Sequence, residues 1–579
     1  MLVAAGLAAM AVPLRADMSG AAKLIERARA DLSRGDGIAA EVDLRKALDA
    51  GAPKEAVAAS MGEAMLDQGE RGKAREWLEP GQFAPEEAFH GFRMLGRLER
   101  LDGNLVAAGH AYDRALAIND KDAGLWVDIG RLRYAGGEHM QAIEAADHAL
   151  SLDPASAPAL EFRAEIVRDQ FGLLAALPWF EAALAHDPNE LQALGEYAAT
   201  LGDLGRAKDM LAVTRHMLEL NSRNPQALYL QAVLAARADD NGLSRSLFDK
   251  IGDRFDNVPG AMLLDSVLNL RSGNFLLAAE TLEKLAARQP GNMRAQELLA
   301  AAYYGAGSYS EVVRRFDPLA GDGAASPYLL TTVARAHEML GERDRAAPLL
   351  DRAANLNDRA TAAVSIGSEL GGMLSRNNLA EAEAAAEQRR TASPGNADAQ
   401  ALAGDVQLAR SSAPAALDRY RLAAKVRVSD SLMERIAVAL AQAGQGDAAA
   451  ALVESHLAQN PSSRTARRLV AALAARQGDW ARAAQLLANL RDSTGGGDVR
   501  LLADLSLAQV RSGNAGEAEK TAAEAYRLQP ASAVTAQAWG MALVALKQRP
   551  QDARALLDKA RAIAGDNPML AEARSQLGG

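Results

Sequence analysis

Small and apolar residues recur along this chain with a period of 34 residues, counted from Ala21. The eighth position of the period is Ala or Gly in nine of the first ten repeats: Ala28, Gly62, Gly96, Gly130, Ala164, Ala198, Ala232, Ser266, Ala300 and Ala334. Ala also predominates at the twentieth position, as at Ala40 and Ala142. Apolar residues between these points recur every three or four residues, which is the spacing of amphipathic helices. Each period therefore predicts two helices joined by a short turn, often with a glycine, as in Ser272-Gly273-Asn274.

The regular spacing within the chain has a direct physical reason. Ala or Gly at positions 8 and 20 stands where the two helices of a pair come closest, so a larger side chain would separate them. Position 32 is Pro in several periods, for example Pro154, Pro188 and Pro290. Proline ends a helix because it lacks an amide donor and clashes with the preceding turn. A single helix pair cannot bury its apolar stripe, so the pattern predicts an all-α solenoid of stacked hairpins.

The period divides the chain into four predicted segments. Residues 17–360 hold ten hairpins in one register, and residues 361–565 continue the solenoid after a shift of two residues, to about sixteen hairpins in all. Residues 566–579 are expected to form a C-terminal capping helix, and residues 1–16 a signal peptide or an apolar N-terminal helix. The turn in the hairpin between Thr200 and Pro225 is ambiguous, because Ala207 and Met210 could each occupy position 20.

The chain resembles the tetratricopeptide repeat family, most clearly in the periods that start at Phe89, Ala123 and Ala157. The period that starts at Ala123 illustrates the match. Trp126, Gly130, Ala142, Ala149 and Pro154 stand at positions 4, 8, 20, 27 and 32 of that period. The resemblance implies a right-handed superhelix whose concave groove is lined by the first helix of each pair. It also implies a non-catalytic scaffold that holds partner proteins or extended peptides, and the chain looks like the scaffolds of this family found in the bacterial envelope.

Composition narrows the function classes further. The net charge of −10 and the pI near 5.5 argue against a general nucleic-acid binder, which would be basic. The chain has no cysteine, which excludes a thiol nucleophile and a thiolate metal site. No metal-binding His-Glu-x-x-His run, phosphate loop or Gly-x-Ser-x-Gly elbow occurs, and the repeats leave no room for a catalytic domain. We therefore expect no enzyme activity, no cofactor and no metal.

The N-terminal stretch bears on the compartment. Leu2–Val12 is continuously apolar or small, and Ala16 follows as a suitable cleavage point. The run is shorter than the roughly 20 residues that span a membrane. We expect export to the periplasm, although no basic residue precedes the run, and the alternatives are an uncleaved helix and a cytoplasmic scaffold. A second functional hypothesis is a subunit of a polysaccharide-export or secretion machine, but the aromatic platforms it would need are sparse, with five Trp and ten Tyr.

The family resemblance implies which residues face the groove, namely positions 2, 5, 9 and 12 of each first helix. In two consecutive repeats these positions supply basic or polar groups: His90, Arg93, Arg97, Arg100, Arg131 and Tyr134. Later repeats supply an apolar stretch: Tyr229, Val233, Leu263, Val267 and Leu270. These residues predict a partner segment with an acidic portion and apolar anchors. Reversing the charges of Arg93 and Arg97 is expected to release this segment and to leave the melting temperature nearly unchanged.

The alternative is that these groups serve the fold. The arginines would then pair with local acids such as Glu99, Glu161 and Glu165, and the apolar residues would belong to the core.

Overall fold

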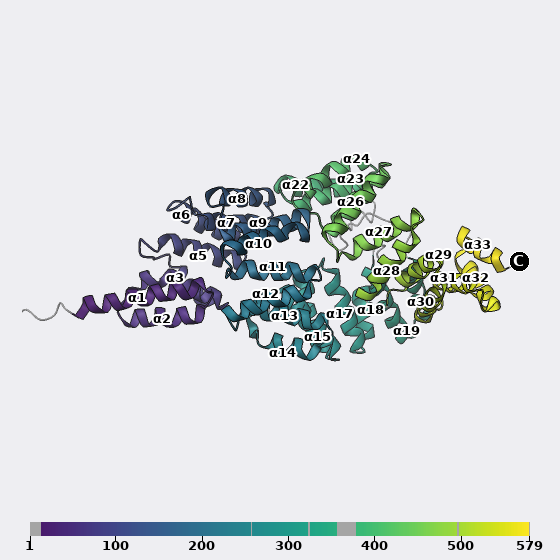
Figure 1. Ribbon diagram of the computed structural model, residues 1–579, viewed down its shortest axis with the longest axis horizontal. Coiled ribbons are helices and arrows are strands. Elements are labelled where there is room, and N and C mark those ends of the chain that lie inside the picture. Colours follow the sequence, from purple (N-terminus) through teal and green to yellow (C-terminus); the bar gives the residue numbers. More distant parts are fainter. Residues whose placement is uncertain (1–12, 256, 322–324, 356–377, 495–496, 578–579) are drawn as a thin grey trace, which may run out of the picture. The chain divides into compact units, whose positions relative to one another are not determined.

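The computed structural model describes residues 13–255, 257–321, 325–355, 378–494 and 497–577 (Figure 1). Within these ranges the regular structure consists of 32 α-helices and one short 3₁₀ turn (η1, Gly252–Phe255), without a strand. Successive helices pair as hairpins along the chain. The all-α repeat fold predicted from the sequence is confirmed.

The helices form two compact units, which we describe separately. Unit 1 comprises Met1–Asn257 with Ala392–Ala397. Its helices are α1 (Pro13–Ser33), α2 (Gly37–Asp49), α3 (Lys54–Asp67), α4 (Arg71–Leu78), α5 (Ala88–Leu101), α6 (Leu105–Leu116), α7 (Ala123–Ala135), α8 (His139–Leu152), α9 (Ala157–Phe171), α10 (Leu173–His186), α11 (Leu191–Asp203), α12 (Ala207–Leu220), α13 (Pro225–Arg237) and α14 (Asn241–Asp249). From α2 to α14, the even-numbered helices start every 34 residues.

Unit 2 comprises Val258–Thr391 with Asp398–Gly579. Its described helices are α15 (Pro259–Arg271), α16 (Phe275–Arg288), α17 (Met293–Gly305), α18 (Tyr309–Gly321), α19 (Pro327–Met339), α20 (Arg343–Asn355), α22 (Leu379–Ala392), α23 (Ala397–Ala409), α24 (Ala413–Ala424), α25 (Asp430–Gln442), α26 (Gly446–Gln459), α27 (Arg464–Arg476), α28 (Trp480–Thr494), α29 (Val499–Arg511), α30 (Ala515–Leu528), α31 (Ala533–Leu546), α32 (Pro550–Ala564) and α33 (Pro568–Leu577).

The hairpin between α5 and α6 shows why the repeat needs small residues. A Cβ atom added to Gly96 would lie 2.3 Å from Cε1 of Tyr112, whose ring is buried between the two helices. The turn itself requires Gly103, whose φ of 82° lies in the left-handed region that favours glycine. The chain therefore packs a large aromatic ring in one helix against a missing side chain in the other.

The structure answers one question that the sequence left open, the register of the α11–α12 hairpin, and does not test the other, the fate of the N-terminal stretch. Met210 is the buried residue that fills position 20 of the α11–α12 hairpin, so this hairpin keeps the common register.

Leu2–Val12 lies outside the described residues, and α1 begins at Pro13. Among the helices described here, none combines the length and apolarity that a membrane crossing requires. The division into segments and the cleavage at Ala16 stay predictions.

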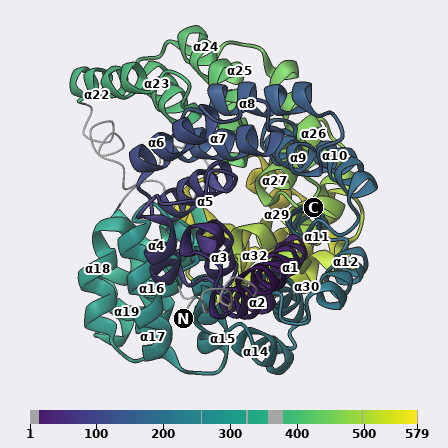
Figure 2. The same ribbon diagram turned by 90° about the vertical axis from the view of Figure 1, so that its left-hand side faces the viewer.

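In unit 1 the odd-numbered helices contact one another in succession, from α1 to α13. We call the surface formed by those of their side chains that point away from the even-numbered helices the A face. Figure 2 shows α5, α7 and α9 on the inner side of α6, α8 and α10. The A face thus brings side chains from consecutive repeats onto one surface.

Candidate functional site

The A face of unit 1 contains a cavity of about 280 Å³ between α3, α5, α7, α9 and α11. Ten of its fifteen lining residues stand at positions 2, 5, 9 and 12 of their repeats. The lining consists of Glu63, Leu66, Asp67, Arg93, Met94, Arg97, Arg100, Leu101, Val127, Asp128, Arg131, Pro158, Glu161, Glu190 and Gln192. The structure therefore brings four of the expected groove residues together, namely the arginines at positions 93, 97, 100 and 131.

Two of these arginines are held by one buried carboxylate. Nε of Arg93 donates to Asp128 at 2.6 Å, and Nε of Arg97 donates to the same carboxylate at 2.9 Å. The Asp128 side chain is only 2% exposed. Burial alone would raise the pKa of Asp128, but the charges of Arg97 and Arg93 outweigh it and hold this pKa well below its usual range. Asp128 therefore stays ionised and compensates charge inside the cavity.

Arg131 lies between two acids of α9. It donates to Glu165 at 2.8 Å and also to Glu161, which is fully buried. Burial raises the pKa of Glu161 well above its usual range. Despite its own burial, Glu165 has a lowered pKa because of its contact with Glu161 and Arg131. Arg131 is thus committed to α9, as the alternative interpretation of the sequence expected.

Arg100 differs from the other three arginines. No ion pair joins it to any acid in the part of the chain that the structure describes, and its Nε is buried without a hydrogen-bond partner. The hydroxyl of Tyr112 lies near it and is likewise buried without a partner. Burial raises the pKa of this phenol, as does the charge of Asp128. The cavity therefore keeps one guanidinium that local acids do not neutralise.

The remaining predicted groove residues lie outside this cavity. His90 places Nε2 2.9 Å from Glu63, and the Tyr134 hydroxyl donates to Asp169. The ring of Tyr229 packs on Phe255 with centroids 5.7 Å apart.

The apolar members of the set are only partly available to a partner. Val233 is half-buried on α13. Leu263, Val267 and Leu270 are half-buried on α15 and pack against a buried cluster of unit 2. They therefore contribute to the core to a large extent.

The acids that neutralise the cavity were not all foreseen. Glu99, which was one expected partner of the groove arginines, instead accepts from Arg75 at 2.6 Å. Asp128 takes the role of partner because it stands 35 and 31 residues after Arg93 and Arg97, about one repeat away. The expectation that reversing Arg93 and Arg97 leaves stability unchanged is therefore corrected, because the change would remove both cations that compensate Asp128.

Within the described ranges, no group of three or more histidine, cysteine or acidic side chains is placed to hold a metal ion. The described part of the site combines charged side chains, most of them in ion pairs, with apolar residues on a helical surface, an arrangement suited to binding.

Comparison with known proteins identifies the repeat. A sequence model of the tetratricopeptide repeat matches residues 268–311 and 435–498. The chain is a tetratricopeptide repeat protein. Such repeats mediate protein–protein interaction, so this tetratricopeptide repeat protein is an interaction scaffold.

Several known proteins resemble the chain. Cellulose synthase operon protein C of Xanthomonas axonopodis pv. citri (strain 306) is 26% identical over 295 residues, which is 49% of this chain and 18% of that protein. The match therefore spans less than a fifth of that relative's own length. Among solved structures, the APC/C hetero-tetramer Cut9–Hcn1 aligns with a TM-score of 0.33 at 12% identity, over 84% of this chain and 96% of the other. Pseudomonas aeruginosa pilF aligns with a TM-score of 0.29 at 19% identity, over 37% and 98%.

Proposed function

We propose that this tetratricopeptide repeat protein is a non-catalytic adaptor of the bacterial envelope that holds an extended segment of a partner protein on the A face of unit 1. The observation that carries the proposal is Arg100, the cavity arginine that has no ion pair within the described residues. A guanidinium presents several donors in a fixed fork that matches a carboxylate. The segment that binds there therefore carries an acidic side chain or a C-terminal carboxylate.

The other cavity arginines have a different role in this proposal. Arg93 and Arg97 keep Asp128 ionised, and Arg131 joins α7 to α9. Arg93 also lies 3.6 Å from Asp122, so Asp122 and Asp128 together offset Arg93 and Arg97. These arginines therefore fix the shape of the cavity rather than select an anion. Specificity for the acidic group then rests on Arg100.

The envelope assignment has two supports. The first is the apolar stretch Leu2–Val12 followed by Ala16, which has the form of a secretory signal. The second is the similarity to cellulose synthase operon protein C, whose name also favours a second candidate function, a subunit that accompanies a polysaccharide synthesis or export machine. A cytoplasmic scaffold is the alternative that cell fractionation would reveal.

The groove assignment is tested by capture with matched variants. Immobilised wild type, Arg100→Glu and Arg45→Glu are exposed to the same periplasmic extract, and bound proteins are quantified by mass spectrometry. Arg45 is an exposed arginine of α2 that pairs with Glu41, away from the cavity. The proposal expects a protein that is bound by wild type and by Arg45→Glu but lost with Arg100→Glu.

Two further measurements complete the test. A synthetic peptide with the acidic segment of the captured protein should compete for wild type, and its carboxylate-to-amide version should not. If Arg100→Glu retains the same proteins as wild type, the A face is not the binding surface.

A further inference from the structure

An exposed apolar surface of unit 2 lies at the start of α16. Phe275, Leu276 and Leu277 are the first three residues of this helix, at positions 17 to 19 of the eighth repeat. None of the other nine repeats counted from Ala21 has three large apolar side chains at these positions, so the repeat fold does not require them. Leu276 and Leu277 are 71% and 52% exposed. Adjacent exposed apolar side chains, unlike single ones, mark interaction surfaces.

A cavity of about 540 Å³ adjoins these leucines, between the start of α16 and the turn after α17. The ring of Phe275 packs against α17, where a Cβ atom added to Gly305 would lie 2.5 Å from Cδ1 of Phe275. The missing side chain of Gly305 thus seats the aromatic ring. We call the residues that line this cavity the apolar edge: Gly273, Asn274, Phe275, Leu276, Leu277 and Ala306.

The apolar edge has no charged side chain among the residues that the structure describes. The charged side chains in the first two turns of α16 and α18 all pair within the chain: Glu280 with Lys284 at 2.9 Å, Glu311 with Arg314 at 2.9 Å, and Arg315 with Glu283 at 3.1 Å. These neighbouring charges are therefore already balanced and do not select a charged partner.

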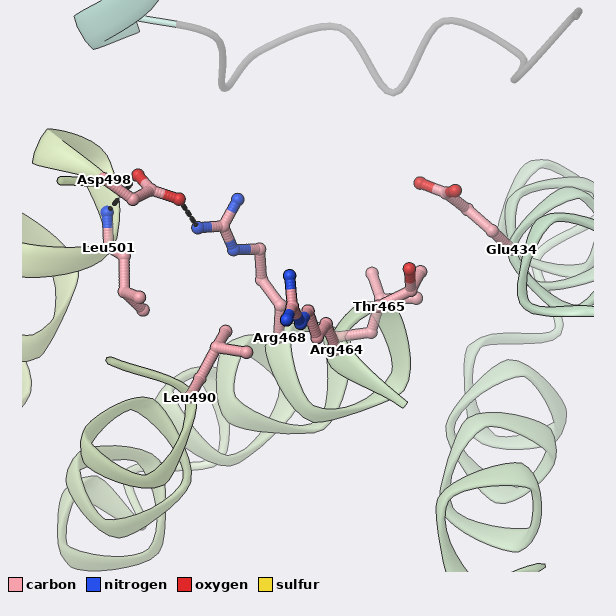
Figure 3. A pocket seen from close by; sticks show the side chains of 8 residues that line it. Glu434, Arg464, Thr465, Arg468, Leu490, Asp498 and Leu501 are labelled. Carbon is pink, nitrogen blue, oxygen red and sulfur yellow. Dashed lines mark hydrogen bonds and ion pairs between the residues drawn. The ribbon is translucent and has the colours of Figure 1, made fainter. Parts of the chain in front are cut away.

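Another cavity of unit 2, shown in Figure 3, differs in this respect. It has a volume of about 400 Å³ between α25, α27, α28 and α29, and Arg468 donates to Asp498 there at 2.6 Å. Glu434 and Arg464 also line it. A partner of that cavity has to match these charges, whereas a partner of the apolar edge has to present an uncharged apolar surface.

We infer that the apolar edge binds the apolar edge of a second copy of this chain. A two-fold interface brings the same surface of both copies together, so this surface must be complementary to itself. The apolar edge meets the condition because it has both a projecting side chain, Leu276, and a cavity beside it. Leu276 of each copy would enter the cavity of the other, and the residues that meet there carry no charge.

A membrane surface suits the apolar edge less well. Peripheral binding to lipid combines apolar side chains with free basic ones. Arg314 and Arg315, in the first two turns of α18, are both engaged by acids of the same chain. Self-association in unit 2 is also independent of the groove proposed for unit 1.

Sedimentation equilibrium of the full chain measures this association. Between about 1 and 100 µM the mean mass should rise from 61.0 kDa, the mass of one chain, toward twice that value. Leu276→Glu should raise the dissociation constant of the dimer by about tenfold or more, because it replaces two apolar anchors by two like charges. The matched control is Val106→Glu, since Val106 occupies the same repeat position in α6 and is 77% exposed. This control should associate as wild type does.

Disulfide cross-linking then locates the contact. The chain has no cysteine, so a single introduced cysteine reports alone. Leu277→Cys should form a covalent dimer on mild oxidation, and Val106→Cys should not. Far-UV circular dichroism checks that the helices of each variant are intact.

Four results would each overturn the inference. The first two are a mass of one chain over the whole concentration range and a Leu276→Glu variant that associates as tightly as wild type. The third is a Leu277→Cys variant that cross-links no faster than Val106→Cys. The fourth is flotation of wild type, but not of Leu276→Glu, with neutral phosphatidylcholine vesicles, because the apolar edge would then bind lipid.

Discussion

The replacement Asp128→Asn tests the ion pairs of the A face most directly. It keeps the size of the side chain but removes the charge that holds Arg93 and Arg97 at 2.6 and 2.9 Å. Breaking a buried ion pair by removing one partner costs about 3–5 kcal/mol. We expect the lower end of that range, because Arg97 is 34% exposed and water can solvate it in part.

The expected loss is local, because each repeat of a solenoid contacts mainly its neighbours. Hydrogen exchange followed by mass spectrometry is therefore the suitable assay. Peptides from α5 and α7 should exchange faster by roughly a hundredfold, since 1.4 kcal/mol corresponds to a factor of ten. Peptides from α13 and α14 should keep their protection.

The pH dependence gives a second readout with a defined sign. The pKa of Asp128 is depressed in the folded chain, so its contribution to stability is present above the unfolded value of about 3.9 and is lost as the pH falls through the folded value. The difference between wild type and Asp128→Asn should be constant from about pH 5 to 8 and shrink below about pH 4.

The control replacement is Asp147→Asn on α8. Asp147 is 57% exposed and lies 3.5 Å from Arg163, so its loss should cost less than about 0.5 kcal/mol. If Asp128→Asn and Asp147→Asn change the exchange of α5 and α7 equally, the ion pairs of Asp128 do not stabilise the A face.

Two further substitutions and the N-terminal processing have defined outcomes. Gly96→Leu should cost about 1–3 kcal/mol by overpacking against Tyr112, whereas Gly516→Leu, whose Cβ would meet open space, should not lower the urea midpoint. His337→Leu should cost about 1–3 kcal/mol in the same assay, because this buried imidazole bridges two carboxylates, and a variant as stable as wild type would contradict this. The exported protein should begin at or near Asp17 by N-terminal sequencing of the periplasmic fraction, and recovery only of full-length cytosolic protein would exclude processing.

The sequence predicted the fold well because the repeat imposes a strict spatial rule. Ala or Gly predominates at positions 8 and 20, where two helices touch, so the pattern recurs over ten repeats and indicates the register. Gly96 against Tyr112 shows the same rule at atomic distance. Ten of the fifteen residues that line the cavity stand at the positions that the family resemblance implies, but only four of the eleven residues named from the sequence are among them.

Charge compensation was harder to predict, because the acid that neutralises an arginine lies on the next first helix. The alternative interpretation paired the groove arginines with acids such as Glu99, Glu161 and Glu165, and only the last two lie next to one of them, Arg131. Asp128 occupies position 6, which the groove rule does not include. A search for opposite charges about one repeat apart would have found it, since its two ion pairs span 35 and 31 residues.

The ion pairs of the A face also have a mechanical consequence. Arg97 joins α5 to α7, Arg131 joins α7 to α9, and Arg168 joins α9 to α11 through Glu196 at 2.9 Å. These links lie on the side of the odd-numbered helices, so bending that spreads this side stretches them, whereas bending toward it does not. We therefore expect unit 1 to resist bending that spreads this side more than bending toward it, and we expect salt to weaken the solvent-exposed ion pairs more than the buried ones.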